Sequence, residues 1–322
     1  MTDEGLIFEV KGVVHPEERI IAYLRYIRDD QGERNSKDGY RYKKIYSLKK
    51  RELYLREKHP RYLWKSDMHG RMVQSVPIDH VAFTLNPVDA LRQLRDMGNH
   101  VSPIQEAARK LAELFVHVSG ISWSDIGITG SLLVGLETTR SDIDMIVFGE
   151  NASRTLHNHL IGNKSIPGVG RYQGELLEKH LQFRWPEQDR FLEKLRAIEA
   201  EKAFQGVFHS WEFFVRAVKL PAEVNWKYND LSFKEETNVV ARGRVLDDSD
   251  AIFTPCYYAV ECDEIPALRY LTSYRGRFTE HVRRGMQVEV GGRLETVRNV
   301  VTQDEYQQLV LGERKSDYLI PV

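Results

Sequence analysis

The stretch SDIGITGSLLVGLETTRSDIDMIVFG, from Ser124 to Gly149, decides the fold. It predicts a short strand, a tight turn at Gly130-Ser131, a brief helical turn, a polar loop and a second strand that begins at Asp142. Alternate residues of a strand point to the same face of its sheet, so Asp142 and Asp144 project together. The pattern therefore predicts two carboxylates directed at one point.

These two carboxylates stand at the start of an apolar strand, where a cation or a proton must offset their mutual repulsion. Mg²⁺ suits such a site, because it binds a few carboxylate oxygens together with substrate phosphates. Two such ions, roughly 3.5–4 Å apart, bridge the attacking and leaving oxygens of a phosphoryl transfer. Upstream, the Gly130-Ser131 turn offers backbone N–H groups and a hydroxyl to a triphosphate. We therefore expect a two-metal Mg²⁺ site, with Mn²⁺ as an alternative ion, and an NTP substrate.

The motif hydrophobic-Gly-Ser, a spacer of about ten residues and then Asp-hydrophobic-Asp-hydrophobic resembles that of the nucleotidyltransferase superfamily typified by DNA polymerase β, especially its minimal members. The resemblance covers about 26 residues and says little about the rest of the chain. It implies a mixed sheet with helices on one face and transfer of a nucleoside monophosphate from an NTP to an acceptor hydroxyl, with release of pyrophosphate. By the same resemblance, Gly130 and Ser131 would cradle the triphosphate, and Asp142 and Asp144 would hold the metal ions.

Members of this superfamily usually carry a third carboxylate on a neighbouring strand. The run VFHSWEFFVRAVKL, which begins at Val207, predicts one strand in which Phe208, Glu212 and Arg216 share a face. Glu212 is therefore the third metal ligand that we expect, and it would act as general base on the acceptor hydroxyl. An ordinary ion pair between Glu212 and Arg216 is the competing interpretation. The fallback acids, which turns also explain, are Asp230, Asp247 and Asp248.

Charge is concentrated in one segment, although the whole chain has a formal charge of only -1. Residues 34–71 hold thirteen Lys and Arg against four Asp and Glu, a local charge of +9, interleaved with six Tyr and Trp. Cations that pair with phosphates, beside aromatic rings that stack on bases, are typical of RNA-binding surfaces. A solvated strand face is the alternative. The RNA-binding residues that we expect are Arg41, Lys43, Lys44, Lys49, Lys50 and Arg51.

The 322 residues are about twice the length of a typical domain. We expect an α+β protein with a basic, aromatic β-rich module at 1–100, a nucleotidyltransferase core at 101–222 and a small β-sheet or barrel at 223–322. No apolar run is long enough to cross a bilayer, and the start MTDEG lacks a secretory signal. We therefore expect a cytoplasmic protein with no membrane partner.

Local signals support this division. Ser102, Pro103 and Gln105 predict a capped helix start, and Gly120 predicts its end. Short strand-like runs separated by turns follow from about residue 239, with a hairpin turn expected at Gly291-Gly292. These runs predict the small C-terminal sheet or barrel.

The acceptor is the open part of the functional prediction. The basic stretch favours RNA, with a transfer RNA or another structured end as an example. Transfer to a partner protein and transfer to a small hydroxyl compound are alternatives within the same chemistry. A non-catalytic RNA- or nucleotide-binding protein that keeps the fold is an alternative of another class. A third acid beside Asp142 and Asp144 would favour catalysis over that last alternative.

Overall fold

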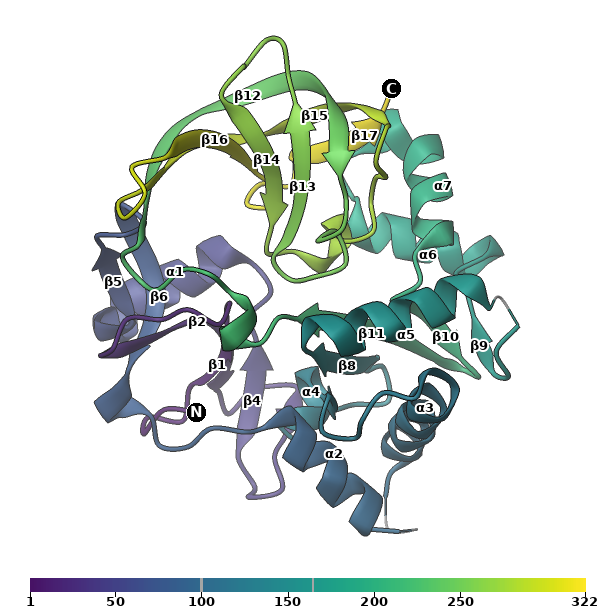
Figure 1. Cartoon of the computed structure of the whole chain (residues 1–322). Coiled ribbons are helices and arrows are strands. Elements are labelled where there is room, and N and C mark those ends of the chain that lie inside the picture. The colour runs from purple at the N-terminus through teal and green to yellow at the C-terminus, as the bar shows by residue number, and fades with distance from the viewer. Residues whose placement is uncertain (99–100, 164) are drawn as a thin grey trace.

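Three sheets follow one another along the chain in the computed structural model, which describes residues 1–98, 101–163 and 165–322 (Figure 1). Helices lie between and beside them, so the protein belongs to the α+β class, as predicted. Short 3-10 helices occupy Pro60–Tyr62, Ile78–His80, Asp189–Phe191, Pro221–Glu223 and Gly276–Phe278. Within the described ranges, no helix has both the length and the apolar character that crossing a membrane requires.

The N-terminal sheet is antiparallel, with the order β3-β4-β2-β6-β5 and with β1 paired to β2. Its strands are β1 (Ile7–Val10), β2 (Arg19–Arg28), β3 (Arg34–Asn35), β4 (Arg41–Lys44), β5 (Leu63–Ser66) and β6 (Arg71–Pro77). Helix α1 (Leu48–Lys58) packs on this sheet and begins at the N-cap Ser47. Sequence reasoning missed α1, because only Arg51 and Leu55 of its residues are buried and no apolar stripe marks it.

The middle sheet carries the motif and has the order β7-β8-β11-β10-β9. Its strands are β7 (Ile126–Ile128), β8 (Ile143–Phe148), β9 (Val169–Gly170), β10 (Gln205–Phe208) and β11 (Trp211–Val218). Strands β8 and β11 are parallel, and the other pairs are antiparallel. The short helix α4 (Gly130–Leu133) occupies the motif turn after β7.

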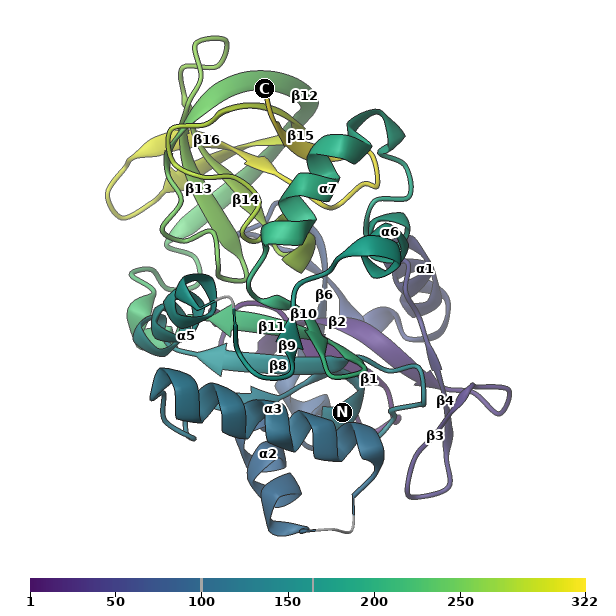
Figure 2. The same cartoon turned by 90° about the vertical axis from the view of Figure 1, so that its right-hand side faces the viewer.

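Helices cover one face of this sheet (Figure 2). They are α3 (Pro103–Ser119) and α5 (Glu150–Gly162), whereas α2 (Pro87–Asp96) packs at the edge strand β7, where Pro87 lies against Gly127. The predicted capping box at Ser102 and Gln105 is present, and Gly120 ends α3 in the left-handed conformation. Met145 of β8 and Val215 of β11 belong to the same buried cluster as these helices. The alternate residues, including Asp144, are therefore on the other face.

The predicted single strand over 207–220 is wrong, because β10 and β11 form a hairpin. His209 takes φ +53° and reverses the chain together with Ser210. Phe208 consequently lies opposite Trp211 and joins the buried cluster that contains Phe213. Phe208 therefore does not share the face of Glu212.

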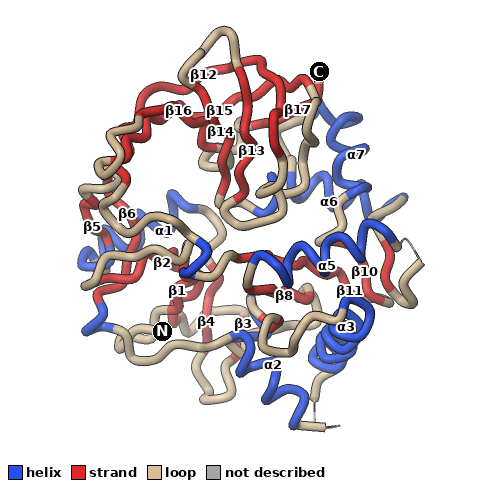
Figure 3. Tube along the Cα trace, viewed as in Figure 1, coloured by secondary structure: helices blue, strands red, loops and turns tan. Residues whose placement is uncertain are grey.

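The C-terminal strands close a barrel (Figure 3). They are β12 (Leu231–Asp247), β13 (Cys256–Glu261), β14 (Leu268–Ser273), β15 (Gln287–Asn299), β16 (Glu305–Val310) and β17 (Tyr318–Pro321). The ring runs β12-β13-β14-β16-β15 and back to β12, with β14 and β16 parallel and β17 added on β15.

Gly291 and Gly292 do not form the predicted hairpin turn, because both lie inside β15. A Cβ on Gly291 would approach the Tyr318 ring to 2.5 Å, so packing rather than a turn requires glycine there. Helices α6 (Gly174–Arg184) and α7 (Leu192–Glu201) share the buried cluster of the barrel. They do so although they fall within the predicted range 101–222, and the three domain ranges stay predictions.

Candidate active site

Asp142 and Asp144 project from the start of β8 on the face that the helices leave uncovered. Asp142 is exposed and Asp144 is half-buried. Gly130 lies directly against Asp144, since a Cβ at Gly130 would stand 2.0 Å from Oδ2 of that carboxylate. The Thr129 N–H donates to the Asp144 carbonyl at 2.9 Å, which fixes the motif turn beside β8. The structure thus places the glycine of the motif against one of its two acids.

Burial, and next the neighbouring Asp142 carboxylate, raise the pKa of Asp144 to about 7. Arg216 and Lys44 act in the opposite direction, but they do not cancel the shift. At neutral pH, negative charge at this carboxylate is therefore only partly compensated by the chain itself. A bound cation would supply the missing compensation.

Replacing Asp144 with Asn should stabilise the metal-free chain at neutral and alkaline pH. A carboxyl with a pKa of about 7 when folded and an ordinary value of 3.8 holds its proton more tightly in the folded state. Its stabilising effect is complete below pH 3.8 and is lost as the pH rises through about 7. After allowance for partial solvent exposure, we expect Asp144→Asn to gain on the order of 2–3 kcal/mol at pH 8 and much less at pH 4. Urea unfolding with a chelator present measures this difference, and a gain that did not depend on pH would contradict it.

Glu212 lies on β11 next to the acid pair. Phe214 is beside Asp144 in the parallel register. Glu212 lies two residues before Phe214, and Asp142 lies two residues before Asp144. Glu212 and Asp142 therefore occupy neighbouring positions on the same face. The side chain of Glu212 is exposed and accepts a hydrogen bond from the Tyr172 hydroxyl at 2.8 Å.

The competing interpretations of this region are not supported. Arg216 does not pair with Glu212, because its Nη1 lies 3.1 Å from the Glu9 carboxylate. Two of the fallback acids accept hydrogen bonds within turns: Asp230 from the Lys227 N–H at 2.7 Å, and Asp247 from the Ser249 N–H at 3.3 Å. Glu212 thus remains the acid that the sheet register brings next to the pair.

Ser131 is buried, and its hydroxyl donates to the Ser141 hydroxyl at 3.2 Å. Ser141 Oγ also accepts from the Thr138 N–H at 2.9 Å. These bonds tie the Gly-Ser turn to the residue just before Asp142. In this arrangement the Ser131 hydroxyl is engaged within the loop.

Four charged side chains from two sheets meet beside Asp144, and sequence reasoning did not identify this group as part of the site. Glu9 of β1 lies 2.7 Å from Lys11, 3.2 Å from Arg25 and 3.1 Å from Arg216. One carboxylate thus holds three cations, which leaves a positive excess. Burial lowers the pKa of Lys11 to about 8, with Arg216 and Arg25 acting in the same direction and Glu9 in the opposite one. No short motif links these residues, because they meet only through packing of the N-terminal sheet on the middle sheet.

The six residues predicted to bind RNA do not form one surface. The prediction that Arg51 binds RNA is wrong, because this residue is 1% exposed and donates to the carbonyls of Ile45 and Tyr46 at 2.7 and 3.2 Å. Lys44 is half-buried, its electrostatic partners include Asp144 and Asp142, and its ammonium lies 5.1 Å from the Tyr46 ring. It therefore faces the acid pair. The exposed members are Arg41, Lys43, Lys49 and Lys50.

A cavity of about 960 Å³ lies between the N-terminal sheet and the uncovered face of the middle sheet. Glu9, Lys11 and Arg216 line it, together with Thr129 before the motif turn. Its volume suits a ligand of nucleotide size, although Asp142, Asp144 and Glu212 are not among its lining residues.

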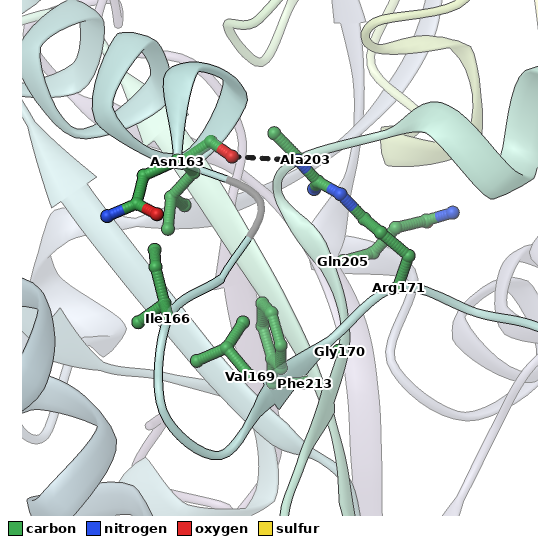
Figure 4. A pocket seen from close by; sticks show the side chains of 9 residues that line it. Asn163, Ile166, Val169, Gly170, Arg171, Ala203, Gln205 and Phe213 are labelled. Carbon is green, nitrogen blue, oxygen red and sulfur yellow. Dashed lines mark hydrogen bonds between the residues drawn. The ribbon is translucent and has the colours of Figure 1, made fainter.

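A second cavity, near β9 and β10, holds only about 20 Å³. Figure 4 shows its lining, in which the Arg171 guanidinium donates to the Leu160 carbonyl at 2.9 Å. That volume admits at most a water molecule, so this cavity is not a substrate site.

The residues of the candidate site fit a hard divalent cation. All three candidate ligands, Asp142, Asp144 and Glu212, offer carboxylate oxygen, and burial together with the Asp142 carboxylate disfavours an uncompensated negative charge on Asp144. The carboxylate oxygens of these three residues do not all lie within 4.8 Å of one another. In the part of the chain that the structure describes, the set of three ligand side chains within 4.8 Å is Asp3, Glu4 and His80, near the N-terminus. That set is surface-exposed in part and has no further feature that indicates an ion.

The chain is similar to an uncharacterized protein of Methanocaldococcus jannaschii, with 24% identity over 98% of this chain and 95% of that protein. No family model matches the chain, and no solved structure matches it. The similarity extends over nearly the whole of both proteins and carries no information on activity.

Proposed function

We propose that the protein is a metal-dependent nucleotidyltransferase, which moves a nucleoside monophosphate from an NTP to an acceptor hydroxyl. The observation that carries the proposal is the geometry at β8. Asp142 and Asp144 share the uncovered face, Gly130 lies against Asp144, and Glu212 stands beside Asp142 in the register. The two predicted halves of the motif therefore meet in space, and a third acid accompanies them.

In the proposed reaction, the acceptor hydroxyl oxygen attacks the α-phosphorus of the NTP. A new P–O bond forms, the bond between the α-phosphorus and the bridging oxygen breaks, and pyrophosphate leaves. Glu212 takes the hydroxyl proton, which its exposed position and single hydrogen bond from Tyr172 allow. The backbone of the Gly130-Ser131 turn, together with Lys44 and Arg216, would neutralise the triphosphate.

Asp142, Asp144 and Glu212 would hold Mg²⁺ or Mn²⁺. When bound, such ions stabilise negative charge on the attacking and leaving oxygens. The chain itself supplies the rigid strand that positions the ligands, because alternate residues of β8 are locked in the buried cluster.

RNA is the acceptor that the charge distribution favours. Lys43, Lys49 and Lys50 are exposed on β4 and α1, and Lys44 at the end of β4 faces the acid pair. The basic segment thus leads from the surface to the proposed site. A polyanionic acceptor whose end reaches Asp144 fits this arrangement.

Incubation with each α-labelled NTP, Mg²⁺ and total cellular RNA or protein tests the proposal. We expect label in the RNA fraction and release of pyrophosphate. Label in the protein fraction would show that the acceptor is a protein, and the proposed transfer chemistry would stand. No label in any fraction, with metal and each NTP supplied, would overturn the proposed activity in favour of a binding protein.

Charge reversal of Lys43, Lys49 and Lys50 to Glu should weaken RNA binding about tenfold or more at low salt, without changing NTP binding. Each lost phosphate contact should also lower the slope of log affinity against log salt by about one. Filter binding across a salt series measures both quantities.

The matched control for this triple variant reverses three exposed lysines on other elements, Lys110, Lys179 and Lys315. Equal losses in the two triple variants would show that the total charge of the chain, and not the position of Lys43, Lys49 and Lys50, attracts the RNA.

A further inference from the structure

Three half-buried tyrosines lie side by side on the outer face of the barrel: Tyr257 on β13, Tyr270 on β14 and Tyr306 on β16. The rings meet edge to face: the centroids of Tyr257 and Tyr270 are 6.2 Å apart at an interplanar angle of 85°, and those of Tyr270 and Tyr306 are 5.4 Å apart at 74°. The residues that flank Tyr257, Cys256 and Tyr258, belong to the buried cluster inside the barrel. The three phenols therefore point away from the barrel core, across neighbouring strands.

A fourth tyrosine connects this row to the cavity beside the acid pair. Tyr274 follows the end of β14, is 37% exposed and lines the 960 Å³ cavity together with Arg216. Burial raises the pKa of Tyr257 well above its ordinary value, and the next contributions come from Tyr274 and Tyr306. Thr272 of β14 is paired with Tyr257, so Tyr274, two residues further along, lies on the same face near Tyr257. The row is continuous from Tyr306 to the cavity.

Several cations gather where the row meets the cavity. Glu9 is held by three cations there, and Arg275 adds a further positive charge that acts on Tyr23 and Glu9. At the far end, the Arg269 guanidinium lies 5.5 Å from the Tyr306 ring while it binds Asp304 at 2.7 Å. The cavity end is therefore complementary to a polyanion, and the barrel end offers mainly aromatic surface.

We infer that the row Tyr306, Tyr270, Tyr257 and Tyr274 is a stacking platform for unpaired bases of a single-stranded RNA acceptor. This inference rests on the proposed function and deepens it, because it names the form of the acceptor and its path. Aromatic rings bind any base through its flat face, whereas a duplex hides those faces. The strand crosses the barrel along the row, and its end enters the cavity that contains Arg216 and Glu9, next to Asp144.

Fluorescence anisotropy with a labelled, unstructured oligoribonucleotide of about twelve nucleotides tests the platform on the full chain. Tyr270→Ala and Tyr306→Ala should each weaken binding about tenfold, since one stacked base contributes about 1–3 kcal/mol. Tyr270→Phe and Tyr306→Phe keep the ring and should bind within about twofold of the parent. A duplex of the same sequence should not respond to either pair of substitutions.

Unchanged binding by the Ala variants, or an equal loss in the Phe variants, would overturn the platform. So would a dimer in solution that Tyr270→Ala dissociates, since the row would then be covered by a second copy. Thermal unfolding of both variants shows that the fold is kept. Two results on the parent separate the proposals. Tyrosine-dependent RNA binding without nucleotide transfer would refute only the transferase, and nucleotide transfer without tyrosine-dependent RNA binding would refute only the platform.

Discussion

Asp144→Asn should lower incorporation of label from an α-labelled NTP by about a thousandfold or more, with the fold intact. The amide keeps the size of the carboxylate and its contact with Gly130, but it loses the charge that a divalent cation requires. Asp142→Asn should have a similar effect, because both side chains project from the same face of β8. Initial rates at saturating NTP and Mg²⁺ measure the loss.

The exposed carboxylate Asp263 on the barrel supplies the matched control, and Asp263→Asn should retain parental activity. The stability of Asp144→Asn adds a second readout, because that variant should be more stable than the parent at pH 8 while it is inactive. Loss of activity together with loss of stability would indicate a misfolded protein instead. Parental incorporation by both Asp142→Asn and Asp144→Asn would exclude a role for the acid pair in transfer.

The candidate site could be predicted as far as its determinants are local. Alternation along β8 was sufficient to place Asp142 and Asp144 on one face, since Ile143 and Met145, which alternate with them, must be buried. The start of α3 could be predicted equally well, because the capping box uses only Ser102 and Gln105. Glu212 was selected by alternation as well, although the hairpin at His209 limits that alternation to β11.

What sequence reasoning missed depends on contacts between distant segments. Arg51 adds to the charge of residues 34–71, yet two backbone carbonyls hold it in the interior, and a charge count cannot distinguish it from Lys50. Glu9 and Arg216 are more than two hundred residues apart, and only packing of two sheets brings them within 3.1 Å. The tyrosine row has the same origin, because its members lie on three strands, of which β14 and β16 are far apart in the sequence.

Gly130→Ala should lower nucleotide transfer at least about a hundredfold, for two separable reasons. Gly130 has φ +64°, a conformation that costs a residue with a Cβ about 1–2 kcal/mol. The added Cβ would also stand 2.0 Å from Oδ2 of Asp144, with the carboxyl carbon and Cβ of Asp144 at 2.8 and 2.9 Å. The carboxylate must therefore move, and a misplacement of about 1 Å can cost a hundredfold in rate. We expect a loss of at least that size in incorporation, together with a decrease of about 1–3 kcal/mol in the free energy of unfolding.

Gly135 provides the control that separates backbone strain from this contact. It also has φ +64°, but an added Cβ there would meet no atom within 4 Å. Gly135→Ala should therefore show the strain alone, with a similar cost in stability and nearly parental transfer. If Gly130→Ala and Gly135→Ala lost activity equally, loop conformation would explain both results. A loss of activity in Gly130→Ala alone would instead support a mechanism in which the carboxylate of Asp144 occupies the space that a side chain at position 130 would fill.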